Sequence, residues 1–223
     1  YYLHLFSRKQ PDLNWENPEV RAAVHRMMNW WVDRGVDGFR MDVINLISKT
    51  LPLTDGPVEP GRPYSQEVSG VANGPRLTEF LEEMNHAVGI TERGLFTVGE
   101  MVASTVEHAR EYASQFHPRL GMVFTFEHMS LDQEPGADKF AHRPLHLPDL
   151  KKNLAHWQRG LAVEGWNSLY WENHDQPRVV SRFGDDSPAH RVACAKAWAT
   201  VLHLHCGTPY IYQGEEIGMV NAG

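Results

Sequence analysis

Apolar residues near the start of the chain recur at the spacing of a helix and then form a short continuous run. Val20, Val24 and Met28 lie four residues apart, as on one face of a helix. The segment Asn17–Glu19 before them supplies a capping Asn, a Pro at the first helical position and an acid near the positive end of the helix dipole. The run Gly35–Asp42 after them predicts a short buried strand.

The same alternation of helix and strand repeats to the end of the chain. Each of the five predicted strands comes directly after a predicted helix. Such an alternation indicates parallel strands, because a parallel pair needs a crossover connection and these connections are right-handed. The later helices are predicted over 75–88, 105–113, 148–162 and 190–203, and the later strands over 95–100, 122–126, 168–172 and 208–212.

Two architectures fit this alternation, a doubly wound sheet and a barrel of parallel strands. No Gly-x-Gly-x-x-Gly follows a predicted strand, so the phosphate cradle of a nucleotide-binding sheet is missing. Polar residues instead stand at the carboxyl ends of successive strands, where barrel enzymes place their chemistry. The sequence therefore predicts an α/β fold of the TIM (β/α)8 barrel type. Five units do not close a barrel of eight, so residues 1–223 are expected to be part of a single catalytic barrel domain.

Composition and charge narrow the classes of function. The formal net charge is -7 and there is no Lys/Arg-rich block, which argues against a nucleic-acid partner. No apolar run approaches the roughly 20 residues that a membrane-spanning helix needs, and no signal peptide opens the chain. Cys194 and Cys206 are expected to be reduced thiols, which excludes a disulfide framework. We expect a cytoplasmic monomer that acts on a small neutral substrate.

Three carboxylates stand at the ends of predicted strands. Asp42 is two residues from Arg40, so both side chains point to the same side of a strand. The guanidinium is expected to keep this carboxylate ionised, as a nucleophile requires. Glu100 ends the next strand and Asp175 follows the strand predicted over 168–172. Three such carboxylates suit the cleavage of a sugar bond, since one can attack the anomeric carbon, one can protonate the leaving oxygen and one can stabilise positive charge.

Each of these residues also has a structural interpretation. Arg40 and Asp42 can form a buried ion pair, and Glu100 can be solvated in a loop. Asp175 can belong to a turn, because Asn-His-Asp is a good turn sequence. Their joint placement at strand ends favours catalysis. The pair in Glu83–His86 has metal-ligand spacing on a helix, but without a second such motif a solvated helix face is the simpler interpretation, and no metal site is predicted.

The strand ends resemble signature regions of a known enzyme family. Gly38–Val43, Phe96–Glu100 and Glu172–Asp175 resemble three signature regions of glycoside hydrolase family 13, the α-amylase family. Further segments resemble the oligo-1,6-glucosidase branch of this family, and the resemblance covers essentially the whole chain. These further segments are Tyr1–Phe6, Gln10–Trp15, Phe126–His128, Gly165–Tyr170 and Gly207–Glu215.

The resemblance implies a role for each residue of the site. Asp42 matches the nucleophile of the family, Glu100 the general acid/base and Asp175 the residue that stabilises the transition state. Arg40 matches the arginine that orients the nucleophile, and His174 the histidine that binds sugar hydroxyls. The remaining substrate-binding residues that the resemblance implies are Val43, Asn45, Arg178 and, in the second sugar subsite, Lys139.

The implied activity is that of a retaining hydrolase that releases glucose from the non-reducing end of short α-glucosides. Val43, directly after the nucleophile, and Asn45 resemble enzymes that act on α-1,6 bonds. Trehalose-6-phosphate hydrolases also share Val at this position, so this activity stays open as an alternative. A non-catalytic glucosidase-like protein is the alternative from another class.

Several parts of the family's fold have no counterpart in the sequence. They are the first barrel strands, the small domain inserted after the third strand and the C-terminal β domain. The chain is therefore expected to be an internal fragment of the catalytic barrel that is inactive by itself. No cofactor is expected in this segment, and a structural calcium would belong to the N-terminal part.

Overall fold

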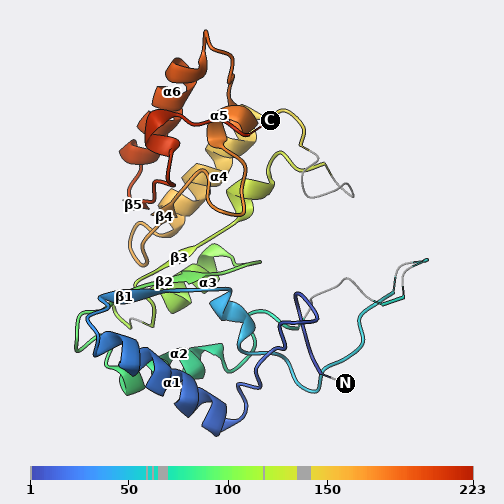
Figure 1. Cartoon of the computed structure of the whole chain (residues 1–223), viewed down its shortest axis with the longest axis vertical. Coiled ribbons are helices and arrows are strands. Elements are labelled where there is room, and N and C mark those ends of the chain that lie inside the picture. The colour runs from blue at the N-terminus through green and yellow to red at the C-terminus, as the bar shows by residue number, and fades with distance from the viewer. Residues whose placement is uncertain are drawn as a thin grey trace. The chain divides into compact units, whose positions relative to one another are not determined.

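The computed structural model describes residues 2–58, 60–61, 63–64, 70–117, 119–134 and 142–222. The chain divides into two compact units, Tyr1–Val123 and Phe124–Gly223. Both units contain strands that alternate with helices along the chain (Figure 1). The predicted alternation is confirmed, whereas the expectation of a single domain stays a prediction.

The first unit begins with the helix that the apolar repeat predicts. Helix α1 (Pro18–Val32) starts after Asn17, whose side chain accepts a hydrogen bond of 2.9 Å from the backbone N–H of Glu19. Helix α2 (Leu77–Val88) lies beside α1 (Figure 1) and ends at Gly89, which adopts the left-handed conformation with φ 69°. The apolar face of α2 forms much of the core of this unit, through Leu77, Phe80, Leu81, Met84 and Val88.

Glu83 and His86, the pair with metal-ligand spacing, both lie on α2. The Glu83 carboxylate accepts a hydrogen bond of 2.7 Å from Nε of Arg21 on α1. This ion pair joins the two helices, so the structure gives Glu83 a role in helix packing.

Three strands of the described residues form one sheet in the order β1–β2–β3. They are β1 (Gly38–Met41), β2 (Phe96–Glu100) and β3 (Met122–Phe124), and helix α3 (Val106–Tyr112) follows β2. β1 and β2 are parallel, as predicted, with Gly38 opposite Phe96. Gly38 is required there, because a Cβ would lie 2.0 Å from the carbonyl oxygen of Phe96.

β1 is more exposed than the sequence predicts. Met41 is buried, but Gly38 and Phe39 are half-buried and Arg40 is exposed. The reason is the position of β1 at one end of the strand order, where it is paired with β2 alone among the described residues. The prediction of a buried strand over Gly35–Asp42 was therefore wrong in its burial and too long.

The second unit contains a parallel pair, β4 (Ser168–Leu169) and β5 (Thr208–Pro209). Both strands are shorter than predicted. After β5, the backbone N–H of Tyr212 bonds to the Glu215 carboxylate at 3.1 Å and thus turns away from the β4–β5 ladder. The helices of this unit are α4 (Leu147–Gly160), α5 (Val179–Phe183) and α6 (Arg191–Leu204), and its core contains Met129, Leu150, Tyr170, Trp171, Val179, Val180 and Leu202.

Candidate functional site

Arg40 joins the two carboxylates at the ends of β1 and β2. Its Nη2 donates a hydrogen bond of 2.6 Å to Oε2 of Glu100, and its Nη1 donates to Oδ1 of Asp42. The register of the strands sets this contact, because Arg40 lies opposite Val98, two residues before Glu100. The structure therefore brings together the predicted nucleophile, the predicted acid/base and the arginine between them.

The two carboxylates differ sharply in their exposure to solvent. The Glu100 side chain is 8% exposed, whereas the Asp42 side chain is 76% exposed. Burial raises the pKa of Glu100 above its ordinary value, and the neighbouring Asp42 carboxyl raises it further, while the Arg40 charge opposes the shift. A buried carboxyl with a raised pKa beside an exposed carboxylate is the pairing that a general acid and a nucleophile need.

Val43, directly after Asp42, has a strained backbone. Its φ of 36° and ψ of 44° are left-handed, a conformation that costs a β-branched residue on the order of 1–3 kcal/mol. In this conformation the Val43 N–H donates to Oε2 of Glu100 at 3.3 Å. The strained residue thus provides a backbone donor to the Glu100 carboxylate, in addition to Arg40.

Asn45 lies behind the carboxylates and is fully buried. Its Nδ2 donates to the carbonyl oxygen of Val102 at 2.7 Å and to Oδ1 of Asn73 at 3.2 Å. The backbone N–H of Asn73 in turn donates to the carbonyl oxygen of Asn45 at 2.9 Å. Asn45 therefore connects the segment after β1 with the segment after β2, and its role in binding substrate stays a prediction.

His174 and Asp175 lie in an exposed turn after β4, in the second unit. The Asp175 N–H donates to Oδ1 of Asn173 at 2.7 Å, and the Gln176 N–H donates to the Asn173 carbonyl at 3.3 Å. Nε2 of His174 lies 3.2 Å from Oδ2 of Asp175. The turn interpretation of Asp175 is thus correct, and it is compatible with a catalytic role because the turn presents the carboxylate to solvent.

Arg178 is held by groups from three segments of the second unit. Its Nη1 donates to Oε1 of the buried Glu172 at 2.6 Å and to the carbonyl oxygen of Gln213 at 2.7 Å. Its guanidinium lies 4.8 Å from the centre of the Tyr212 ring. The backbone N–H of Arg178 donates to Oδ1 of Asn221 at 2.9 Å. Arg178 therefore ties the segment after β4 to the segment after β5, and its predicted contact with sugar stays a prediction.

Two further points concern the predicted site residues. Lys139 lies outside the described residues. The separation of Asp175 from Asp42 and Glu100 stays a prediction, because these residues belong to different units.

Sequence reasoning missed a buried ion pair of the second unit, between Arg182 and Asp132. A charged residue beside the apolar Val179, Val180 and Phe183 was the signal that could have found it.

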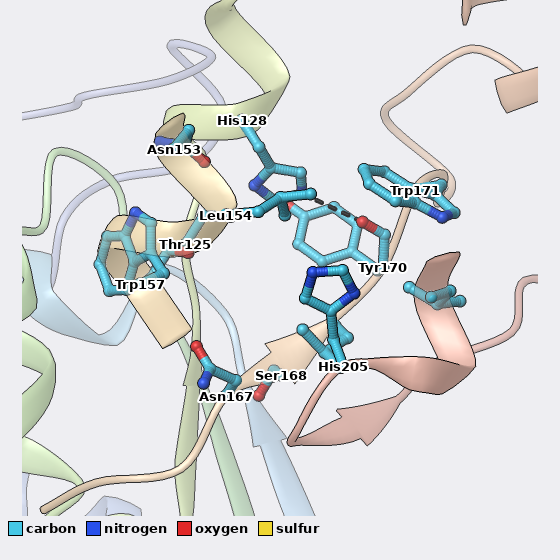
Figure 2. A pocket seen from close by; sticks show the side chains of 12 residues that line it. Thr125, His128, Asn153, Leu154, Trp157, Asn167, Ser168, Tyr170, Trp171 and His205 are labelled. Atoms are coloured by element: carbon cyan, nitrogen blue, oxygen red, sulfur yellow. Dashed lines mark hydrogen bonds between the residues drawn. The ribbon is translucent and has the colours of Figure 1, made fainter. Parts of the chain in front are cut away.

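A small cavity of about 40 Å³ lies in the second unit (Figure 2). At its wall, Nε2 of His128 donates to the Tyr170 carbonyl at 3.0 Å, and the Tyr170 hydroxyl donates to the Thr125 carbonyl at 2.7 Å. None of the twelve described residues that line it carries a carboxylate. The cavity has room for a few water molecules but neither the size nor the acids for sugar chemistry.

The described part of the chain offers neither a metal site nor a membrane-spanning helix. It contains no group of three or more His, Cys, Asp or Glu side chains that could hold a metal ion. No helix of these residues is long and apolar enough to cross a membrane. The candidate residues of the first unit lie at the ends of β1 and β2, and those of the second unit lie in the turn after β4.

Helices alternating with parallel strands, with acidic residues at the carboxyl ends of those strands, are typical of the class of α/β-barrel enzymes. The family model of the alpha-amylase catalytic domain matches residues 1–223. The chain therefore belongs to the α-amylase family, glycoside hydrolase family 13, and its fold is part of a TIM barrel.

Individual relatives agree with this assignment. The chain is 56% identical over 221 residues to an oligo-1,6-glucosidase of Halalkalibacterium halodurans, which covers 99% of this chain and 39% of that protein. It is 54% identical to an alpha-glucosidase of Pediococcus pentosaceus, over 100% of this chain and 40% of that protein. A crystal structure of trehalose-6-phosphate hydrolase from Bacillus licheniformis matches with a TM-score of 0.90 and 44% identity, over 99% of this chain and 38% of that one. The chain thus spans about two-fifths of the length of these relatives.

Proposed function

We propose that the protein is a retaining glycoside hydrolase that releases glucose from the non-reducing end of short α-glucosides, with a preference for α-1,6 bonds. The observation that carries the proposal is the pair of carboxyl groups that share Arg40, in which Glu100 is buried with a raised pKa and Asp42 is exposed. The names of the relatives, oligo-1,6-glucosidase and alpha-glucosidase at 56% and 54% identity, support the substrate class.

The proposed reaction is a double displacement. Asp42 attacks the anomeric carbon while the protonated Glu100 gives its proton to the glycosidic oxygen, so the aglycone leaves and a glucosyl ester forms on Asp42. Glu100, now ionised, takes a proton from water, which attacks the anomeric carbon and releases glucose and the free Asp42 carboxylate. Asp175 stabilises the positive charge that develops on the sugar ring in both steps.

The other predicted residues act around these three carboxylates. Arg40 orients Asp42 and offsets its charge, and His174, exposed beside Asp175, binds sugar hydroxyls. Val43 lies next to the nucleophile and selects the linkage, while Lys139 contacts the second sugar. Asn45 and Arg178 are the remaining residues proposed to bind the substrate, and their hydrogen bonds to Val102 and Glu172 support a fixed position for each. We further propose that the protein works as a cytoplasmic monomer.

A second candidate function is the hydrolysis of trehalose 6-phosphate. The chain is 50% identical over 221 residues to the trehalose-6-phosphate hydrolase of Escherichia coli, which covers 99% of this chain and 38% of that protein. The solved structure with a TM-score of 0.90 also carries this name. Such an enzyme needs a basic pocket for the phosphate in addition to the carboxylates.

Kinetics on a small panel of substrates separates the two candidates. We expect kcat/KM of the purified full-length protein that contains this chain to be highest for isomaltose, lower for maltose and sucrose, and lowest for trehalose 6-phosphate. If kcat/KM is instead highest for trehalose 6-phosphate, the second candidate is established. If none of the four substrates is hydrolysed, both candidates are overturned. Asp42→Asn is the control, and we expect it to lower kcat by roughly 10⁴-fold or more, because the amide is a poor nucleophile.

A further inference from the structure

The side chain of Gln176 connects the turn that carries Asp175 to a neighbouring helix. Within the turn, Asn173 bonds to the backbone of Asp175 and Gln176, as described above. The Oε1 atom of Gln176 also accepts a hydrogen bond of 2.7 Å from Nη1 of Arg182 on α5. The Asp175 turn is thereby connected, through the side-chain amide of Gln176, to the guanidinium of Arg182.

Arg182 is a rigid donor because its side chain is 1% exposed and every N–H of its guanidinium has an acceptor. Nε and Nη2 donate to the two carboxylate oxygens of Asp132 at 2.8 and 2.7 Å, a bidentate contact. The second N–H of Nη2 donates to the Met129 carbonyl at 2.7 Å. Nη1 contacts the Met129 sulfur at 3.7 Å in addition to Gln176.

Stability alone does not explain a buried pair of this kind. Removing two charges from water is costly, and well-packed apolar residues in place of a buried ion pair are often neutral or stabilising. The pair Arg182–Asp132 does, however, fix one N–H in space and direct it at the turn. Asp132 lies just after the 3₁₀ segment Glu127–Ser130, so the pair also links that segment to α5.

We propose that Arg182, anchored on Asp132, is a positioning residue that sets the place of the Asp175 carboxylate through Gln176. The inference rests on the proposed function, in which Asp175 stabilises positive charge in the transition state. An interaction that is stronger in the transition state than in the bound substrate contributes to kcat and little to KM. Loss of the Gln176 acceptor releases the turn, and a displacement of about 1 Å at such a group lowers the rate about 100-fold.

The test compares two substitutions of Gln176 with a matched control. Gln176→Met keeps the shape of the side chain but removes the acceptor, and Gln176→Glu keeps an acceptor oxygen for Arg182. Gln158→Met is the control, because Gln158 also exchanges hydrogen bonds with a loop, at Cys206, but belongs to α4. Each variant is made in the full-length protein that contains this chain. Its kcat and KM are measured on isomaltose, its unfolding midpoint by circular dichroism, and the amide exchange of residues 173–176 by mass spectrometry.

We expect Gln176→Met to lower kcat 10- to 100-fold with KM within about 3-fold of the wild type. Gln176→Glu should restore kcat to within about 5-fold, and Gln158→Met should leave it within 2-fold. The turn amides should exchange faster in Gln176→Met, while the unfolding midpoint stays near that of the wild type. In a double-mutant cycle, Arg182→Lys should lower kcat in the wild-type background and have no further effect on kcat in Gln176→Met.

Several results would overturn the inference. An unchanged kcat in Gln176→Met would do so, as would equal losses in the Met and Glu variants. Unfolding of Gln176→Met below the assay temperature would also contradict it, because the side chain would then hold the fold and not the turn. If the wild type hydrolyses no α-glucoside, the proposed function fails, and the inference is then decided by amide exchange, where unchanged protection of the turn overturns it.

Discussion

In each unit an arginine is connected to a candidate carboxylate, but the kind of contact differs. In the first unit, the partly exposed Arg40 contacts Asp42 and Glu100 directly. In the second unit, the buried Arg182 bonds to Asp132 and reaches the turn of Asp175 through the neutral amide of Gln176. A direct contact changes both the orientation and the charge balance of a carboxylate, whereas contact through an amide changes orientation alone. The comparison therefore predicts strong electrostatic effects at Arg40 and purely positional ones at Gln176.

Removal of the direct contact should have the largest effect. Arg40→Met leaves the Asp42 and Glu100 carboxyl groups side by side without their shared cation, and we expect kcat/KM to fall roughly 10²- to 10³-fold. In the wild type the Arg40 charge opposes the upward shift of the Glu100 pKa, so this pKa should rise further in the variant. The basic limb of the pH dependence of kcat/KM, which reports this acid, should therefore move to higher pH.

Arg34→Met is the matched control for this prediction, because Arg34 stacks on Trp30 at an exposed helix end. We expect it to change kcat/KM less than 2-fold. If Arg40→Met loses no more activity than this control, the electrostatic role of the direct contact is wrong.

Burial shifts pKa values in both units, and in the second unit it acts most fully on the imidazole of His128. Burial lowers the pKa of His128 to about 4, from an ordinary value of 6.5. Below pH 6.5 His128 is protonated in the unfolded chain, but in the folded chain it stays neutral down to about pH 4. The contribution of His128 to the free energy of unfolding therefore falls as the pH drops through this window. His128 alone should contribute a loss of about 3 kcal/mol between pH 7 and pH 4, measured as the difference in urea unfolding between the wild type and His128→Asn.

A substitution isolates this contribution from those of other groups. His128→Asn should remove this contribution, whereas the same change at the exposed His156 should leave it in place. Parallel pH dependences in the wild type and His128→Asn would show that other groups cause the acid sensitivity.

The smallest expected effect concerns linkage preference beside Asp42. Val43→Ala removes two methyl groups next to the nucleophile, and changes of this size shift substrate preference by about 1–3 kcal/mol. We expect the ratio of kcat/KM for maltose to that for isomaltose to rise up to about 10-fold. Val192→Ala, at an exposed position on α6, is the control and should leave the ratio unchanged. An unaltered ratio in Val43→Ala would remove this residue from the choice of linkage.

Local sequence signals predicted the parts of the fold that depend on neighbouring residues. Asn17 was recognisable as a helix cap, and the i, i+2 spacing of Arg40 and Asp42 was enough to predict their contact. The helix α5 was missed, because five residues give no periodic pattern and Arg178 before it makes no side-chain cap. The lengths of β4 and β5 were overestimated because strand ends depend on partners distant in sequence.

Long-range contacts explain what could not be predicted about the site. The bond from Arg40 to Glu100 joins residues 60 positions apart, and the bond from Arg182 to Asp132 joins residues 50 apart. The left-handed backbone of Val43 was also unpredictable, since a β-branched residue normally favours a strand. Charge and spacing therefore identified the candidate carboxylates, whereas the groups that hold them became visible in the folded chain.

The most direct test of the proposed chemistry is to trap the glucosyl ester on the protein. The protein is incubated with 5-fluoro-α-D-glucosyl fluoride, whose ring fluorine slows breakdown of a covalent intermediate, and its peptides are then sequenced by mass spectrometry. We predict a single glucosyl adduct on the carboxylate of Asp42, absent from Asp42→Asn. An adduct on Glu100 or Asp175, or hydrolysis of isomaltose with inversion and no adduct, would contradict the assignment of Asp42 as the nucleophile of a retaining enzyme.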